Sequence, residues 1–371
     1  MDMPKPFALF QDSETPAFYE QTEGFYYRVA YSRSTDSRNT NELGQDYLTF
    51  VTDGKRFSFA LCDGVGQSFY GELAARILGD KLLKWAWNLN FELHDDQIQE
   101  NLRRDLDALT NEASQMVRGY SIPEHVASML RNVLDKKRII GSEAMFICGS
   151  IDFRNDAAGF AWMGDSRLRL WKGEKELLAP FTGLFKTSER WSSVKGPIGE
   201  LHLTSVRLSD FDHLTVYSDG FSYLDTAFQP SKIERPFSNH AINEFIADAA
   251  FQPSSDDISF LEVWTTPRSP QFPKDGEILV ITNLKYRFQS DVHFLFWDAV
   301  AGATEYEIRI SIENKTTLMN KKVVTTEWQN DGKLDITARF ISVRAWQNQE
   351  PGYWSDFLPI ENASPTSICR T

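Results

Sequence analysis

Five aspartates occupy comparable positions beside apolar, strand-like runs in the N-terminal part of the chain. They are Asp46, Asp63, Asp165, Asp219 and Asp256. Two of them directly follow such a run, two come just before one, and Asp165 lies in a short turn between two runs. In an antiparallel sheet the end of one strand lies beside the start of its neighbour, so we expect the five carboxylates to meet at one edge. Like charges gathered in this way are costly unless cations neutralise them, which predicts a site for Mg²⁺ or Mn²⁺.

Each aspartate taken alone has a simpler explanation. The sequence contains Asp-Gly pairs at positions 53, 63, 219, 275 and 331, and such pairs usually form turns. Asp165 could pair with Arg167, and the pair Asp256-Asp257 could be a solvated turn. The pairs at 63 and 219 differ because each ends a run of buried character. The ordered set, rather than any single member, therefore carries the prediction.

Two groups of strands with helices between them are predicted in the same region. Strand patterns cover residues 47–52, 56–62, 144–151, 157–163, 213–218 and 258–264. Helical spacing gives one apolar face each to residues 74–85, 102–116, 126–134 and 241–249. The pattern predicts an α+β fold in which two antiparallel sheets pack together and helices cover the outer faces, giving four layers (αββα).

The composition changes at residues 265–277, where three prolines stand among polar residues. This is typical of a linker. We therefore predict a first domain at 1–266, a linker at 267–276, a second domain at 277–362 and a tail at 363–371. The second domain has short alternating strands separated by turns, which indicates an all-β sandwich.

The charge and cysteine content exclude several classes of function. The net charge of −13 disfavours binding to nucleic acid or to anionic lipid. Three cysteines without a CxxC pair argue against a disulfide framework and fit a reducing compartment. The N-terminus lacks the pattern of a signal peptide, and no apolar run reaches the roughly 18 residues of a spanning helix. We expect a soluble, cytoplasmic protein.

The five aspartates stand in short motifs whose order is specific. The motifs are Gly44-Gln45-Asp46, Asp63-Gly64-Val65-Gly66, Gly164-Asp165-Ser166-Arg167, Ser218-Asp219-Gly220 and Asp256-Asp257-Ile258-Ser259. Over roughly residues 25–265 their order and spacing resemble the type 2C family of metal-dependent Ser/Thr protein phosphatases. The resemblance is closest to the bacterial branch, whose first motif has Gln-Asp.

The resemblance implies a role for each residue of the set. The implied metal-binding residues are Asp46, Asp63, Gly64, Asp165, Asp219 and Asp256. Asp63 would bridge two Mn²⁺ or Mg²⁺ ions, and the Gly64 carbonyl would bind one of them. Asp46 would act in the outer shell or through bound water, and Asp165 would hold a third, weaker ion. The implied reaction is hydrolysis of phosphoserine and phosphothreonine in proteins by a water molecule that two ions activate.

Two positions depart from the family pattern. Val65 stands where many members have a histidine that could act as general acid, although bacterial relatives often lack it. Asn41 stands where an arginine usually binds the substrate phosphate. Arg38 or Arg33 could take over that role from a longer loop, or either could be a solvated surface residue. We take Arg38 as the candidate, beside Asp63 and Asp46 as the candidate catalytic residues.

The second domain resembles a fibronectin type III domain. Trp297 would be the core tryptophan of its second strand, whereas Arg339 and Phe340 stand where a tyrosine is usual. Such a module implies a protein partner.

Three functions are compatible with parts of this pattern. The leading hypothesis is an active phosphatase acting on phosphorylated proteins. The second is an inactive pseudophosphatase that binds a partner through the fibronectin-like module, suggested by Val65 and Asn41. The third is an adhesion or carbohydrate-binding protein, disfavoured by the sparse cysteines and the lack of a signal peptide.

Overall fold

The chain forms two compact units, described here from a computed structural model. Residues 3–124, 126–173, 175–177, 185–227, 237–250, 252, 255–265, 279, 281–289, 292–312, 317–330, 338, 340–347, 350–355 and 358–360 are described. The first unit consists of Met1–Arg235 and Asp256–Pro270, and the second of Pro236–Ser255 and Gln271–Thr371. The predicted boundaries placed residues 236–255 in the first domain, whereas here this range belongs to the second unit. The predicted linker and tail lie outside the described residues.

The first sheet of the first unit is antiparallel and built around a central hairpin. Its order is β1 (Phe7–Ala8), β4 (Tyr47–Thr52), β5 (Arg56–Gly64), β6 (Glu143–Asp152), β10 (Arg190–Ser192) and β11 (Gly196–Ile198). In addition, β7 (Ala157–Met163) pairs with β6, and β12 (His202–Arg207) pairs with β7. The predicted turn at Asp53 joins β4 to β5, and its Oδ1 accepts hydrogen bonds from the amides of Lys55 and Arg56 at 2.9 and 2.7 Å. The side-chain oxygen thus fixes the register of the hairpin.

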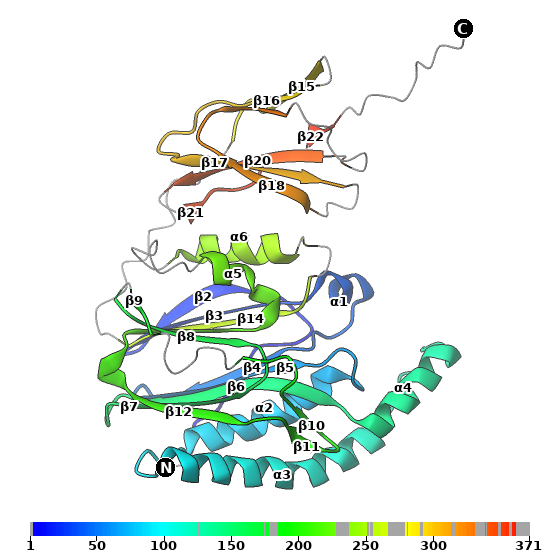
Figure 1. The fold of residues 1–371 in the computed structure, drawn as a ribbon, viewed down its shortest axis with the longest axis vertical. Helices are drawn as coiled ribbons and strands as arrows, with labels where there is room; N and C mark the ends of the chain where they lie inside the picture. The colour runs from blue at the N-terminus through cyan, green and yellow to red at the C-terminus, as the bar shows by residue number, and fades with distance from the viewer. Residues whose placement is uncertain are drawn as a thin grey trace. The chain divides into compact units, whose positions relative to one another are not determined.

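The second sheet lies against the first. Its order is β2 (Thr15–Gln21), β3 (Tyr26–Ser32), β14 (Ile258–Trp264), β13 (His213–Tyr217), β8 (Arg167–Lys172) and β9 (Lys175–Glu176). The hydrophobic core fills the space between the sheets: Phe57 and Ile147 of the first sheet belong to one cluster with Val29 and Leu261 of the second. Figure 1 shows the two sheets as stacked layers. Burial of these faces is the main stabilising contribution to this unit.

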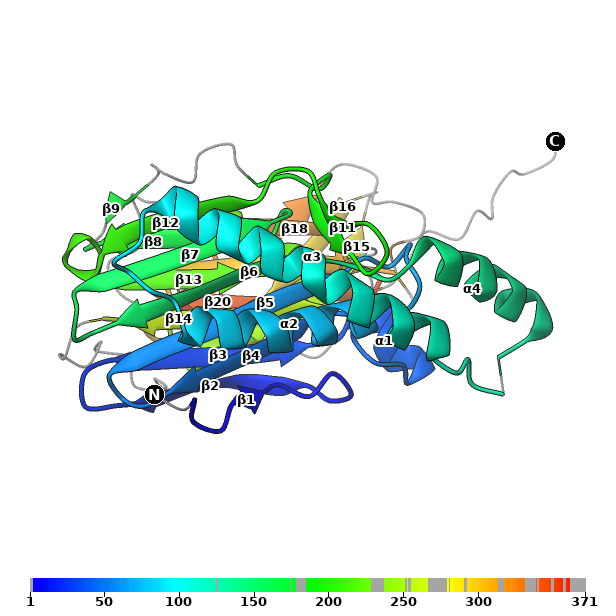
Figure 2. The same ribbon diagram turned by 90° about the horizontal axis from the view of Figure 1, so that it is seen from below.

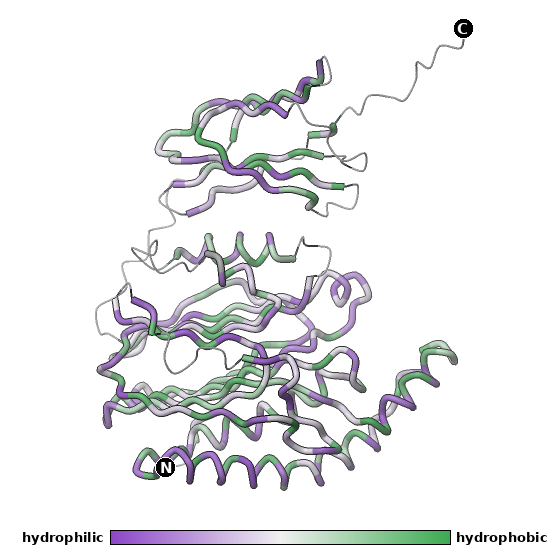
Figure 3. Tube along the Cα trace, in the orientation of Figure 1, coloured by the Kyte–Doolittle hydropathy of each residue, from purple (hydrophilic) through white to green (hydrophobic). Residues whose placement is uncertain are grey.

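Helices α2 (Gly71–Trp87) and α3 (Asp95–Gly119) cover the outer face of the first sheet (Figure 2). Leu78 and Leu82 of α2 pack with Leu102 and Leu106 of α3 and with Cys148 of β6. Hydrophobic and hydrophilic stretches alternate along α3, as one buried face requires (Figure 3). Among the described residues, no helix is both long and apolar enough to span a membrane.

The remaining helical segments of this unit are short or peripheral. They are α1 (Thr35–Thr40), α4 (Ser128–Ile140), η1 (Leu208–Asp210), η2 (Asp219–Phe221) and α5 (Tyr223–Ala227). The predicted apolar face of residues 126–134 is only partly buried, because the side chains of Leu130 and Val133 in α4 are 52% and 44% exposed. The periodicity identified the helix correctly, but it could not tell which part of the face would find a partner.

The described residues of the second unit form two β-sheets and one helix. A three-stranded sheet has the order β15 (Lys285–Gln289), β16 (Val292–Phe296) and β19 (Glu327–Asn330). A five-stranded sheet has the order β18 (Thr317–Val323), β17 (Glu305–Ser311), β20 (Phe340–Gln347) and β21 (Glu350–Pro351), with β22 (Leu358–Pro359) pairing with β20. Its core contains Leu295, Trp297, Ile308 and Val343. Trp297 is thus buried, as expected of a core tryptophan.

Helix α6 (Asn239–Ala250), expected at 241–249, is joined to the five-stranded sheet by buried charges. Asp248 accepts hydrogen bonds from Arg309, from Nη2 of Arg344 at 2.5 Å and from Nε1 of Trp354 at 3.0 Å. Asp248, Arg309 and Arg344 are each less than 5% exposed. Nη2 of Arg344 also donates to Oε2 of Glu307 at 2.7 Å. A buried network of this kind is sensitive to the loss of any one member.

We expect Asp248→Ala to destabilise the second unit by about 3 kcal/mol, because two buried guanidinium groups lose a shared carboxylate. Urea denaturation of the full chain followed by tryptophan fluorescence measures this. The control is Glu305→Ala, which removes a partly exposed ion pair with Lys322 in the same sheet and should cost less than about 1 kcal/mol. Equal effects of the two substitutions would show that burial of the Asp248 network contributes nothing.

Candidate metal centre

Three of the predicted aspartates converge at one edge of the paired sheets. Asp63 is the next-to-last residue of β5, Asp165 lies in the turn between β7 and β8, and Asp219 begins η2 two residues after the end of β13. Each offers a carboxylate oxygen, and these oxygens all lie within 4.8 Å of one another. The register explains the meeting of the last two, since Tyr217 pairs with Arg167 across β13 and β8. Three carboxylates at this separation are a suitable set of ligands for a hard divalent cation.

Close backbone contacts bring the other motifs to the same place. A Cβ atom on Gly220 would lie 2.2 Å from the backbone oxygen of Asp257, so only glycine allows the turn after Asp219 to pack against the start of β14. A Cβ atom on Gly64 would lie 2.5 Å from the carbonyl carbon of Gly71 and 2.8 Å from the backbone oxygen of Gln45. The glycines of these two motifs are therefore required by packing.

Two carboxylate oxygens of the set are buried without a hydrogen-bond donor among the described residues. They are Oδ2 of Asp46 and Oδ1 of Asp165. Arg167, the simpler partner for Asp165, instead donates to its backbone carbonyl, and Nε of Arg167 lies 3.5 Å from Oδ2 of Asp225. A buried carboxylate oxygen without a donor is costly, and a cation would relieve that cost. The residues present thus fit a metal site.

The electrostatics of the cluster indicate the same need for positive charge. Burial, followed by the charges of neighbouring aspartates, raises the pKa of Asp63 and of Asp46 well above the ordinary range. Burial also raises the pKa of Asp165, Asp219 and Asp256. Asp46 and Asp256 lie outside the group of three that meets within 4.8 Å, but their charges act on its members.

Asp257 has a structural role that the sequence did not reveal. It is 2% exposed, its Oδ1 accepts a hydrogen bond from the amide of Ser34 at 2.5 Å, and its Oδ2 accepts one from the amide of Gln45. The interpretation of this aspartate pair as a solvated turn is therefore wrong for Asp257. Through these two hydrogen bonds Asp257 connects the segment before β4 to the start of β14, and this keeps Asp46 near Asp256. Its position directly before a largely apolar strand was the available signal in the sequence.

The comparison with known protein families decides the identity. The sequence model described as Protein phosphatase 2C matches residues 33–259, which contain all five aspartates. The chain belongs to the protein phosphatase 2C family. It is therefore a metal-dependent Ser/Thr protein phosphatase, the activity that the motifs predicted. No curated protein matches the sequence.

Solved structures with a similar fold include phosphatases of two named bacteria. Serine/threonine phosphatase Stp1 from Staphylococcus aureus is 13% identical, with 66% of this chain and 97% of that chain covered and a TM-score of 0.45. The S. agalactiae serine/threonine phosphatase is 16% identical, with 65% and 100% covered and a TM-score of 0.42. RsbX in complex with magnesium is 12% identical, with 67% and 100% covered and a TM-score of 0.43.

The departures from the type 2C pattern have local explanations in the structure. Asn41 ends α1 in the left-handed conformation, with φ of 55°, which asparagine adopts more readily than arginine. Arg33 is buried, and its Nε donates to Oε1 of Glu14 at 2.9 Å, so it is committed to an ion pair. Arg38 is exposed and its Nη2 donates to Oγ1 of Thr35 at 3.2 Å. Of the two arginines, Arg38 can turn toward an incoming anion without breaking an ion pair, whereas Arg33 would have to leave its partly buried pair with Glu14.

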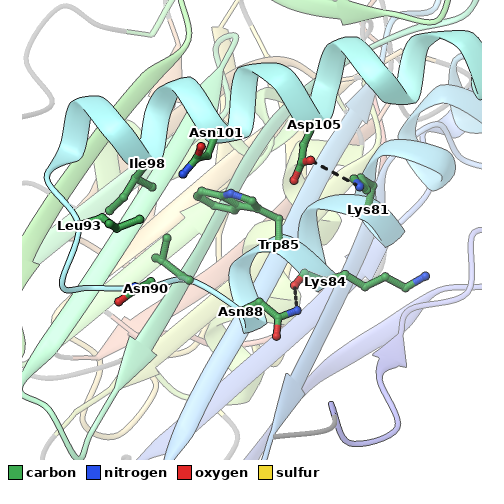
Figure 4. A pocket seen from close by; sticks show the side chains of 10 residues that line it. Lys81, Lys84, Trp85, Asn88, Asn90, Leu93, Ile98, Asn101 and Asp105 are labelled. Carbon is green, nitrogen blue, oxygen red and sulfur yellow. Dashed lines mark hydrogen bonds and ion pairs between the residues drawn. The ribbon is translucent and has the colours of Figure 1, made fainter.

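Two other polar features of this phosphatase lie apart from the carboxylates. A cavity of about 390 Å³ between α2 and α3 is lined by Lys81, Trp85, Asn101 and Asp105, among others, and by none of the five aspartates (Figure 4).

A second group of possible ligands consists of Glu189, Glu200 and His202, each of which has a side-chain ligand atom within 4.8 Å of the others. His202 and Lys186 already pair with Glu189, at 2.7 and 3.1 Å. We assign no ion there.

Proposed function

We propose that the carboxylate cluster holds two or three Mn²⁺ or Mg²⁺ ions and that the loaded protein hydrolyses phosphoserine and phosphothreonine in proteins. The proposed ligands are Asp46, Asp63, Asp165, Asp219, Asp256 and the carbonyl of Gly64. The observation that carries the proposal is the meeting of Asp63, Asp165 and Asp219 within 4.8 Å. Oxygen ligands in this number suit hard divalent ions, and the choice between the two metals rests on that chemistry alone.

The chain's own groups would prepare the site for a phosphate ester. When bound, such ions lower the pKa of water and offset charge on phosphoryl oxygens. Asp63 and Asp219 hold negative charge where the cations bind, and Oδ2 of Asp46, which lacks a donor among the described residues, can accept a hydrogen bond from a water molecule. Asp257 keeps the two halves of the site together. We assign Arg38 to the substrate phosphate, because it is the exposed arginine of α1, six residues after the end of β3.

We further propose that the second unit is a fibronectin type III domain that binds a protein partner. Its three-stranded and five-stranded sheets, with Trp297 in the core, support this assignment. The side of the five-stranded sheet that carries Arg309 and Arg344 already contacts α6, so a partner would use another surface. We also propose, from the sequence, that helices cover the outer faces of both sheets of the phosphatase fold and so complete its four layers. A cytoplasmic location is likewise proposed from the sequence.

The test is hydrolysis of p-nitrophenyl phosphate and of a phosphothreonine peptide by purified protein. We expect turnover with Mn²⁺ or Mg²⁺ and its loss in EDTA. Calorimetry with Mn²⁺ separates this from the pseudophosphatase hypothesis: absence of both ion binding and turnover would favour an inactive scaffold. Turnover that persists in EDTA after dialysis would contradict the proposed chemistry.

A further inference from the structure

Helix α4 presents an apolar stripe to solvent. None of its 13 residues is buried. The stripe consists of Met129, Leu130, Val133 and Ile140, which are 81%, 52%, 44% and 55% exposed. Their spacing places them on one side of a helix with 3.6 residues per turn. Single exposed apolar residues need no explanation, but a contiguous group of them on one helix is a feature of interaction sites.

The opposite side of α4 is fixed to the phosphatase unit. Leu134 packs against the small core of Phe69, Val117 and Ile122. The guanidinium of Arg138 lies 4.9 Å from the centre of the Phe69 ring, and its Nη2 donates to the carbonyl of Tyr120 at 2.9 Å. The helix therefore has a defined rotation, and the stripe faces outward because the other side is anchored.

One end of the stripe lies beside the turn that follows Asp63 and Gly64 in the sequence. Lys137 is on the same side of the helix as Val133, and its Nζ donates to the carbonyl of Gly66 at 3.2 Å. Gly66 lies in the turn that directly follows β5, three residues after Asp63 and two after Gly64. From this point α4 extends beyond the edge of the first sheet (Figure 2). A protein bound at the carboxylates therefore has the stripe within reach.

The charge of α4 is opposite to that of the chain as a whole. The helix carries four basic residues and one acidic residue, in a protein of net charge −13. Lys136 and Lys137 flank the stripe and form no ion pair with any residue that the structure describes. The surface therefore suits a partner that has apolar side chains next to negative charge. A phosphorylated protein has this character.

We propose that the α4 stripe docks the phosphorylated protein substrate, with apolar residues near the phosphorylated side chain seated on Met129, Val133 and Ile140. This inference rests on the proposed phosphatase function. An anionic membrane would also attract a basic amphipathic helix. The contact between Lys137 and the Asp63–Gly66 loop favours the substrate, because it ties the stripe to the place where the phosphate would be hydrolysed.

The test compares a large and a small substrate. The variant Met129→Ser/Val133→Ser/Ile140→Ser is assayed with Mn²⁺ on phosphorylated casein and on p-nitrophenyl phosphate, which is too small to touch α4. We expect kcat/KM for casein to fall at least about tenfold, mainly through KM, with the value for p-nitrophenyl phosphate changed less than about twofold. Circular dichroism checks that the variant folds.

Ile139 offers a matched control. It is 80% exposed, as Met129 is at 81%, but at about 100° per residue it lies about 80° around the helix from Met129, on the flank away from Val133 and Leu130. Met129→Ser alone should raise KM for casein, whereas Ile139→Ser should leave KM unchanged for both substrates. If the triple variant hydrolyses casein as the wild type does, the inference is overturned. The triple variant could instead keep the casein kinetics of the wild type but no longer co-sediment with phosphatidylglycerol vesicles. That result would assign the stripe to a membrane. A wild-type protein inactive on both substrates would refute the proposed function itself.

Discussion

Asp63→Asn should lower kcat for p-nitrophenyl phosphate by at least about a thousandfold, since outer-shell changes at metal sites already cost about 10- to 100-fold. Asp63 is the member of the converging set that ends a central strand, and its carboxylate oxygen lies within 4.8 Å of those of Asp165 and Asp219. The amide keeps the shape of the side chain but removes the negative charge that an ion requires. Steady-state hydrolysis at saturating Mn²⁺ measures the loss.

The other end of the same strand pair provides a control for this substitution. Asp53 also precedes a glycine, but it is exposed and its Oδ1 only accepts hydrogen bonds from the amides of the turn. Asparagine can accept the same bonds, so Asp53→Asn should change kcat less than about twofold. An Asp63→Asn variant that binds Mn²⁺ and turns over like the wild type would remove Asp63 from the proposed ligands.

Removal of metal should make the stability of the phosphatase depend steeply on pH. Without cations, burial and neighbouring carboxylates raise the pKa of Asp46 and of Asp63 in the folded protein, so both carboxylates bind protons at a higher pH there than in the unfolded chain. Burial also raises the pKa of Glu72, near the start of α2, to about 7. Between the ordinary and the raised values the folded state binds more protons than the unfolded chain, so stability falls as pH rises.

We therefore expect the EDTA-treated protein to melt at a lower temperature at pH 8 than at pH 6. Mn²⁺ should reverse this at pH 8, adding about 4 kcal/mol per ion when the free concentration is a thousand times Kd. Differential scanning calorimetry at both pH values, with and without Mn²⁺, measures the effect. The Mn²⁺ gain should shrink in Asp63→Asn and persist in Asp53→Asn. A melting temperature in EDTA that rises from pH 6 to pH 8 would contradict the electrostatic account of the site.

The amino-acid sequence was sufficient for the ligand types and for the main elements. Glycine after Asp63 and after Asp219, together with a strand before each, predicted the carboxylates that now lie together. Helix α6 and strands β4 to β7 occur close to their predicted ranges, because apolar periodicity reports directly on which side of an element is buried. The family follows from the same motifs, and residues 33–259 match it.

Tertiary structure alone decided which partners these residues find. The sequence suggested that Asp257 is a surface turn residue. In the structure it is buried and accepts hydrogen bonds from the amides of Ser34 and Gln45, which are distant in sequence. Asp248 became the centre of a buried charge network only because strands β17 and β20 bring arginines to it. The helical pattern at 126–134 could not show that half of its apolar side would remain exposed. Periodicity and motifs depend on local backbone geometry, whereas these pairings join residues 61 to 223 positions apart in the sequence, which no local pattern records.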